Sequence, residues 1–138
     1  MARTLNIFIS HSWSYGDDYD RLVKMLNERP DFSYKNYSVP KDDPLHNTPN
    51  TQALYNAIKQ QMTTCNVVVI MAGKYSTFSK WINLEINIAK TEFAQKKPIV
   101  AVRPWGADQV SSVVSKNCDR LVNWNTDSIV NAIREISI

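Results

Sequence analysis

The stretch Asn66-Val67-Val68-Val69-Ile70-Met71-Ala72 decides the fold class of this 138-residue chain. It is short, almost wholly apolar and rich in β-branched side chains, which is the pattern of a strand that is covered on both faces. Strands of this kind belong to parallel sheets, because the connections between parallel strands place helices over both faces. We therefore expect helices on each side of this stretch in the sequence.

Strand-like and helical patterns alternate along the whole chain. Strands are predicted at residues 5–10, 34–39, 66–72, 98–103 and 121–122. Apolar spacing predicts helices at residues 19–26, 54–62, 80–94 and 129–136, and a helical turn at 110–114. Residues 40–49 contain three prolines and are predicted to form an irregular loop. This order predicts one α/β domain over residues 1–138, a doubly wound parallel sheet of four to five strands with helices on both faces.

Composition and charge exclude several classes of protein. With 43% hydrophobic and 21% charged residues, the chain is typical of a soluble globular domain. Its longest apolar run is far shorter than the roughly 20 residues of a membrane helix. A net charge of +3 without a block of like charge does not indicate nucleic-acid binding. The only cysteines, Cys65 and Cys118, are expected to be reduced thiols in a cytoplasmic protein without a secretory leader.

Glycine and histidine are too sparse for the common cofactor motifs. Gly16, Gly73 and Gly106 stand far apart, so the sequence contains neither a dinucleotide-binding fingerprint nor a P-loop. His11 and His46 are also far apart, and no cysteine or glutamate stands at a metal-binding spacing from them. We therefore expect no metal and no bound cofactor, and any phosphate must be held by hydroxyls, helix N-termini or single cations.

One acidic residue breaks the pattern of the helix predicted at residues 80–94. On a helical wheel its apolar side consists of Trp81, Ile82, Leu84, Ile86, Ile88, Ala89 and Phe93. Glu85 falls inside this arc, where a carboxylate is costly unless it has hydrogen-bond partners or a chemical role. Two interpretations stay open: a boundary carboxylate that reaches solvent, or a functional one at the carboxyl edge of the sheet. Glu92 lies on the same side, is expected to be solvated and is given no role.

Two segments resemble sequence boxes of TIR domains. Asn6-Ile7-Phe8-Ile9-Ser10-His11 resembles the first box, an apolar strand that ends in Phe-Ile-Ser and an aromatic residue. Ser79-Lys80-Trp81-Ile82-Asn83-Leu84-Glu85-Ile86 resembles the signature Ser-x-Trp-Cys-x-x-Glu-Leu. With residues 98–106 and 121–125, nearly the whole chain resembles the prokaryotic TIR-like family that provides the signalling subunit of Thoeris antiphage defence. The resemblance implies the TIR-like, flavodoxin-like form of the predicted sheet.

The sequence also departs from the TIR pattern. Ile82 replaces the cysteine of the signature, and His11 replaces the usual aromatic residue. The second TIR box reads approximately Arg-Asp-x-x-Pro-Gly, whereas Lys41-Asp42-Asp43-Pro44-Leu45 has a shorter spacing and no glycine. In TIR domains that loop covers the ligand and mediates assembly.

The resemblance implies cleavage of the nicotinamide–ribose bond of NAD, with Glu85 as the essential catalytic residue. The activity would be that of a TIR-type NAD glycohydrolase or cyclic ADP-ribose isomer synthase, with NAD as substrate. The messenger would activate an NAD-consuming effector of the same defence system, and the chain would self-associate as other TIR proteins do. The altered second box favours the alternative of a non-catalytic TIR-like adaptor that acts by assembling with the effector.

Further substrate-binding residues are predicted at the carboxyl edge of the sheet. Hydroxyls and amides after the first strand would meet ribose or pyrophosphate, loop cations would face phosphate, and tryptophans would wall the pocket or stack on a ring. These residues are Ser10, His11, Ser12, Lys41, Ser79, Trp81, Arg103 and Trp105. All of them except Trp105 also have a plainer interpretation: turn residues for the first three, a helix N-cap for Ser79, core packing for Trp81 and solvated cations for Lys41 and Arg103.

Other functions of doubly wound sheets fit less well. Ser10, Ser12 and Ser14 before Gly16 resemble the hydroxyl-rich loop of an FMN-binding protein, but the Thr-Gly pair of such loops is missing. A response-regulator receiver is excluded because the central strand runs into Ala72-Gly73 without a phosphoacceptor aspartate. A Ser-His hydrolase is excluded because no Gly-x-Ser-x-Gly motif occurs.

Overall fold

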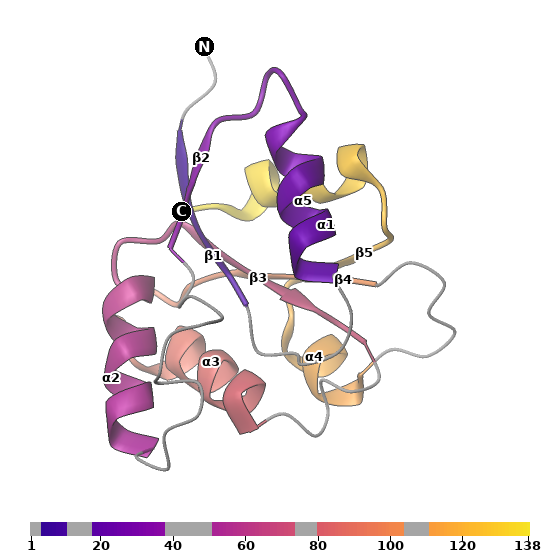
Figure 1. The fold of residues 1–138 in the computed structure, drawn as a ribbon. Coiled ribbons are helices and arrows are strands. Elements are labelled where there is room, and N and C mark those ends of the chain that lie inside the picture. The colour runs from indigo at the N-terminus through magenta and orange to yellow at the C-terminus, as the bar shows by residue number, and fades with distance from the viewer. Residues whose placement is uncertain (1–3, 11–17, 38–50, 74–79, 104–110) are drawn as a thin grey trace.

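The computed structural model of the chain describes residues 4–10, 18–37, 51–73, 80–103 and 111–138 (Figure 1). Strands and helices alternate throughout this part, as predicted. The elements are β1 (Leu5–Ile9), α1 (Asp18–Asn27), β2 (Tyr34–Asn36), α2 (Thr51–Met62), β3 (Val67–Met71), α3 (Lys80–Thr91), β4 (Ile99–Val102), α4 (Ser112–Asn117), β5 (Arg120–Val122) and α5 (Thr126–Ile136). None of the helices within the described ranges has the length and apolar character needed to cross a membrane.

The five strands form one parallel sheet in the order β2-β1-β3-β4-β5. The stretch that decided the fold class contains β3, which lies at the centre of this sheet. Helices α1 and α5 cover one face, and α2, α3 and α4 cover the other (Figure 1). The predicted doubly wound α/β fold is therefore confirmed.

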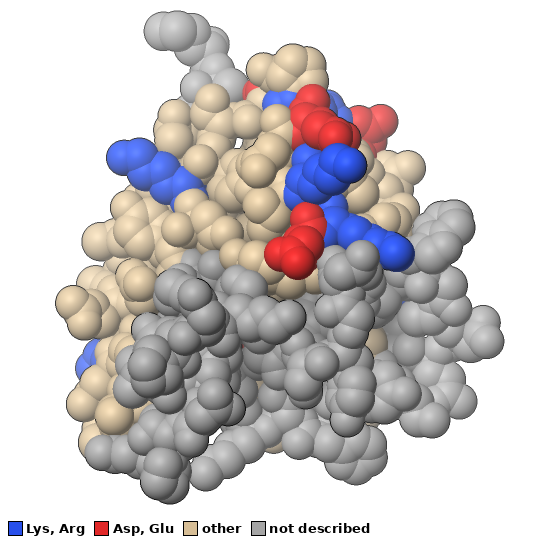
Figure 2. Space-filling view, in the orientation of Figure 1, with Lys and Arg blue, Asp and Glu red and all other residues tan. Residues whose placement is uncertain are grey.

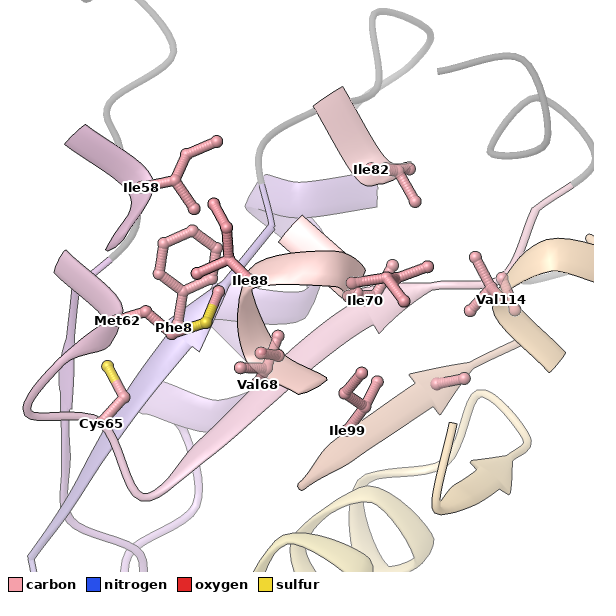
Figure 3. Close-up of a cluster of buried hydrophobic side chains, with 14 of the residues drawn as sticks. Phe8, Ile58, Met62, Cys65, Val68, Ile70, Ile82, Ile88, Ile99 and Val114 are labelled. Atoms are coloured by element: carbon pink, nitrogen blue, oxygen red, sulfur yellow. The ribbon is translucent and has the colours of Figure 1, made fainter. Parts of the chain in front are cut away.

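Two hydrophobic cores explain why β3 is apolar at every position. Successive side chains of a strand point to opposite faces of the sheet, and here both faces are covered. The core on the α2/α3 side consists of Phe8, Leu54, Ile58, Met62, Cys65, Val68, Ile70, Ala72, Ile82, Ile86, Ile88, Ala89, Ile99, Ala101 and Val114 (Figure 3). The core on the α1/α5 side consists of Leu5, Ile7, Ile9, Leu22, Leu26, Phe32, Val67, Val69, Met71, Val100, Val102, Ile129, Val130, Ala132 and Ile133.

The residues that follow the strands continue the backbone pairing and define the carboxyl edge of the sheet. The Ser10 N–H after β1 donates to the Val69 carbonyl at 2.9 Å, and the Ala72 N–H after β3 donates to the Val102 carbonyl at 2.8 Å. The Arg103 N–H after β4 donates to the Val122 carbonyl, also at 2.8 Å. Parallel topology thus brings the ends of β1, β3, β4 and β5 to one edge.

Helix α3 ends at Thr91, whereas the apolar pattern predicts residues 80–94. The carbonyl of Ala89 accepts a hydrogen bond from the N–H of Lys97 at 2.9 Å, which is a partner from beyond the helix. The chain therefore turns back toward the start of β4 after Thr91. Phe93 still packs against the core on the α2/α3 side, so it follows the apolar pattern without being helical.

The final helix, α5, begins at Thr126, three residues before the apolar pattern predicted at residues 129–136. Asn125 is the N-cap of α5, and its side-chain oxygen accepts a hydrogen bond from the N–H of Ser128 at 3.0 Å. The second strand ends at Asn36, earlier than the predicted residue 39. Its pairing continues one residue further, because the Tyr37 N–H donates to the Ile7 carbonyl at 2.9 Å. The predicted loop at residues 40–49 lies outside the described residues.

Lys97 is a buried cation at the amino edge of the sheet, opposite the edge where Ser10 lies. Its ammonium group donates to the carbonyls of Thr63 and Cys65, both at 2.9 Å, and lies 4.8 Å from the centre of the Phe93 ring. Burial lowers the pKa of this ammonium below its usual value. The contacts join the end of α2 to the segments that lead into β3 and β4.

Both cysteines are reduced, and the surface charges of the described residues in Figure 2 are mixed, as the sequence predicts. Cys65 and Cys118 are both free thiols, and burial raises the pKa of Cys65 to about 12. On the face seen in Figure 2, acidic and basic side chains lie together around α1. Among the described residues of that face, the charges mix rather than forming a patch of one sign.

Candidate functional site

Glu85 is fully buried within α3. Its relative exposure is 0%, and its apolar neighbours on the helix, Ile82, Ile86 and Ala89, are buried as well. The interpretation as a boundary carboxylate that reaches solvent is therefore wrong. The wheel position was a sufficient signal, because a residue inside the apolar arc of a helix points toward the sheet that the helix covers.

Ser10 is a hydrogen-bond partner of this carboxylate. The hydroxyl of Ser10 donates to Oε1 of Glu85 at 2.6 Å, and Ser10 is itself only 1% exposed. The strand explains the direction of the side chain: Phe8 belongs to the core on the α2/α3 side, and Ser10 lies two residues further on, directly after β1, where the backbone pairing continues. The sequence therefore delivers a hydroxyl from β1 to a carboxylate from α3.

The length of this contact indicates a strong interaction. Hydroxyl–carboxylate bonds have oxygen–oxygen distances of about 2.5–2.7 Å and are roughly twice as strong as bonds between neutral groups. Burial strengthens it further, because water does not screen charges in the interior as it does at the surface. Ser10 thus holds Glu85 in one orientation at the carboxyl edge of the sheet.

Arg103 lies at the same edge, directly after β4. Its side chain is half-buried, and its Nε atom is fully enclosed. Among the buried side-chain nitrogen and oxygen atoms of the described residues, this Nε is the one without a hydrogen-bond partner. The structure therefore places three predicted site residues, Ser10, Glu85 and Arg103, at one edge of the sheet.

His11, Ser12, Lys41, Ser79 and Trp105 lie outside the described residues, as does the side chain of Trp81. Within the described ranges, no group of three or more His, Cys, Asp or Glu side chains is arranged to hold a metal ion.

One polar residue, Glu92, differs from its prediction, and another, Ser111, was not singled out in the sequence. Glu92 is half-buried rather than solvated, because its Oε2 atom lies 3.3 Å from Nζ of Lys59 on α2. Ser111 is buried at the carboxyl edge, where its N–H donates to the Ala72 carbonyl and its hydroxyl caps α4 by accepting from the Val114 N–H. Ser111 directly precedes α4, and a serine at that position was the available signal for this cap.

Solved structures with a similar fold include two SEFIR domains. A crystal structure of a prokaryotic SEFIR domain is similar over 96% of this chain and 95% of its own, with a TM-score of 0.51 and 13% identity. The SEFIR domain of interleukin-17 receptor B is similar over the same shares, with a TM-score of 0.58 and 12% identity. At this identity the similarity shows the fold alone. No curated protein sequence matches this chain.

A family model described as the TIR-like domain of Thoeris protein ThsB matches residues 8–109. The match covers most of the chain and contains both members of the buried pair, Ser10 and Glu85. It confirms the resemblance that the two sequence boxes indicated. The chain therefore belongs to the TIR-like domain family of Thoeris ThsB proteins, and this membership indicates Thoeris-type defence signalling with a partner in the same system.

Proposed function

We propose that this protein processes NAD into a cyclic ADP-ribose-type messenger, which activates an NAD-consuming effector of the same defence system. Glu85 is the central residue of this activity. One observation carries the proposal: the Glu85 carboxylate is fully buried and accepts a hydrogen bond from Ser10 at the carboxyl edge of a parallel sheet. Sheets of this class bind their ligands at that edge.

The chemistry of NAD cleavage suits a single carboxylate. When the nicotinamide–ribose bond breaks, nicotinamide leaves with the bonding electron pair as a neutral molecule, so no general acid is required. The ribose becomes an oxocarbenium-like cation in the transition state. The carboxylate of Glu85 stabilises that positive charge and accepts hydrogen bonds from the ribose hydroxyls, and this stabilisation is greatest in the transition state.

Ser10 acts as a positioning residue for Glu85 in this mechanism. A free glutamate side chain has several rotatable bonds, and each orientation away from the ribose lowers the fraction of productive encounters. The hydrogen bond from the Ser10 hydroxyl restricts the carboxylate to one orientation before substrate binds. The proposed catalytic group is therefore held by the strand as well as by its own helix.

Cyclisation needs a second step in which water does not compete. An adenosine-derived nucleophile of the same NAD molecule donates an electron pair to the ribose carbon that nicotinamide has left. The new bond closes the ring, and the proton of the nucleophile passes to solvent. Burial of both Ser10 and Glu85 supports a reaction centre shielded from water. Self-association, which the TIR resemblance implies, belongs to the same proposal.

The experiment is an analysis of products formed from NAD by the pure protein. Native protein is incubated with NAD, with and without lysate of phage-infected cells, and the nucleotides are separated by chromatography and identified by mass. We expect nicotinamide and a cyclic ADP-ribose isomer in equal amounts, and neither product from Glu85→Gln. The elution volume of the same protein in size-exclusion chromatography reports its self-association.

The adaptor alternative makes the opposite prediction in this experiment. A non-catalytic protein releases no nicotinamide in either condition and still assembles with the effector. The matched control is Glu92→Gln, which removes a carboxylate just beyond the end of α3 that pairs with Lys59 instead. Absence of nicotinamide release from the native protein in both conditions contradicts the proposal.

A further inference from the structure

Arg103 contains a buried donor that the described part of the protein does not satisfy. Its Nε is enclosed and lacks a hydrogen-bond partner there, while its backbone N–H is paired with the Val122 carbonyl at 2.8 Å. A buried donor left without an acceptor costs about 1–3 kcal/mol, and more when the group is charged. The guanidinium group is always charged, so an anion beside its terminal nitrogens offsets part of the cost of burying this charge.

Strand alternation assigns Arg103 to the face of the sheet that α3 covers. Ile99 and Ala101 of β4 belong to the core on the α2/α3 side, whereas Val102 belongs to the opposite core. Arg103 is the next residue in this alternation, and its backbone pairing with β5 continues the ladder. Glu85 and its partner Ser10 lie on that same face.

The sheet register sets the separation between Arg103 and the Ser10–Glu85 pair. Ile9 is level with Val69, and Ile70 is level with Ala101, so Ser10 is level with Ala101. Arg103 lies two strands away from Ser10 and two residues further along the strand direction. From the usual strand spacing and rise, their Cα atoms are about 12 Å apart. The diphosphate attached to a ribose at Glu85 has to cover a separation of this order to reach the arginine.

We infer that Arg103 binds the diphosphate of the dinucleotide and makes the site specific for diphosphate-containing ligands. A guanidinium group donates two parallel N–H bonds to phosphate oxygens. Because protein atoms cover Nε, the two terminal nitrogens of Arg103 provide that pair. The inference rests on the proposed function for the identity of the ligand. The enclosed donor on the same face as Glu85 is an independent observation.

The test uses ADP-ribose, which carries the diphosphate but contains no nicotinamide to release. Its affinity is measured by calorimetry for the native protein, Arg103→Gln, Arg103→Lys and Arg120→Gln. Arg120 is the matched control, because it is exposed at the start of β5 and pairs with Glu135 at 3.2 Å. We expect Arg103→Gln to weaken binding roughly 10- to 100-fold, from the value of a hydrogen bond to a charged group. The affinity of Arg103→Lys for ADP-ribose should lie between those of Arg103→Gln and the native protein. The affinity of Arg120→Gln should equal that of the native protein.

A second ligand separates phosphate recognition from damage to the site. Nicotinamide riboside lacks phosphate, so its affinity should be the same for the native protein and Arg103→Gln. Unchanged affinity for ADP-ribose in both Arg103 variants, or no binding of ADP-ribose by the native protein, overturns the inference. An equal loss of affinity for ADP-ribose and for nicotinamide riboside in Arg103→Gln also overturns the inference. Nicotinamide release by Glu85→Gln is a separate readout, so failure of this inference and failure of the proposed function are distinguishable.

Discussion

Ser10 and Glu85 are separated by 75 positions in the sequence, yet the hydroxyl of Ser10 donates to the Glu85 carboxylate at 2.6 Å. Both side chains are buried, and they come from different layers of the fold: β1 in the sheet and α3 above it. Packing of α3 on the sheet therefore assembles the pair. A substitution at either residue should alter the free energy of unfolding and the proposed NAD chemistry in separable ways.

Replacement of Ser10 by alanine removes the donor to Glu85. We expect the free energy of unfolding to fall by about 1–3 kcal/mol, since a buried charged acceptor loses one of its partners. Nicotinamide release should fall roughly 10- to 100-fold, because the carboxylate is no longer held in one orientation. Urea denaturation and the NAD assay measure the two effects. Ser115→Ala, whose hydroxyl bonds only locally to the Ser112 carbonyl, is the control and should change neither quantity; an equal effect in both variants contradicts the prediction.

Replacement of Lys97 by methionine tests the buried cation at the opposite edge. Methionine keeps the apolar stem but leaves the carbonyls of Thr63 and Cys65 without the ammonium donor. We expect a loss of about 2–4 kcal/mol in the free energy of unfolding. The control is Lys96→Met, because Lys96 is exposed. The free energy of unfolding of this variant should lie within about 0.5 kcal/mol of that of the native protein. Similar denaturation midpoints for both variants would show that the Lys97 contacts contribute little.

Alkaline pH should destabilise the protein through Cys65. Burial raises its pKa from 9.0 to about 12, and its thiol donates to the Gln61 carbonyl at 3.3 Å. Above pH 9 the unfolded chain releases the thiol proton while the folded protein retains it, so stability is lost as the pH rises toward 12. Lys97 opposes this trend just below pH 10.5, because burial lowers its pKa and the unfolded chain then binds more protons there.

The measurement is the free energy of unfolding from urea titrations between about pH 8 and 11. Native protein should lose stability with pH more steeply than Cys65→Ala, in which the titrating thiol is absent. The comparison concerns the slope, since alanine also lowers stability at every pH through lost packing. Parallel slopes for the two proteins contradict the assignment to Cys65.

The arrangement of strands and helices could be predicted because local patterns carry it. The apolar run at β3 required a sheet covered on both faces, and the alternation of elements then gave the doubly wound topology. Glu85 could be singled out for the same reason, since the wheel of α3 placed a charge inside an apolar arc. Its burial confirms that the wheel was informative.

Contacts between elements could not be predicted, since they depend on packing rather than on local pattern. Ser10 was expected to meet a ligand, and its bond to Glu85 depends on where α3 rests against β1. Glu92 was expected to be solvated, but the packing of α3 beside α2 brings Lys59 within 3.3 Å. Lys97 stands in a polar stretch and is buried because its N–H bonds back to the carbonyl of Ala89.

The rate of nicotinamide release from NAD by Glu85→Gln tests the central claim most directly. Glutamine has nearly the shape of glutamate and its amide oxygen can still accept from Ser10, so the variant should fold with a melting temperature close to that of the native protein. It lacks the negative charge that stabilises the ribose cation, and we expect release to fall roughly 100- to 1,000-fold. Glu92→Gln should release nicotinamide at the native rate. Release by folded Glu85→Gln at the native rate would contradict the account.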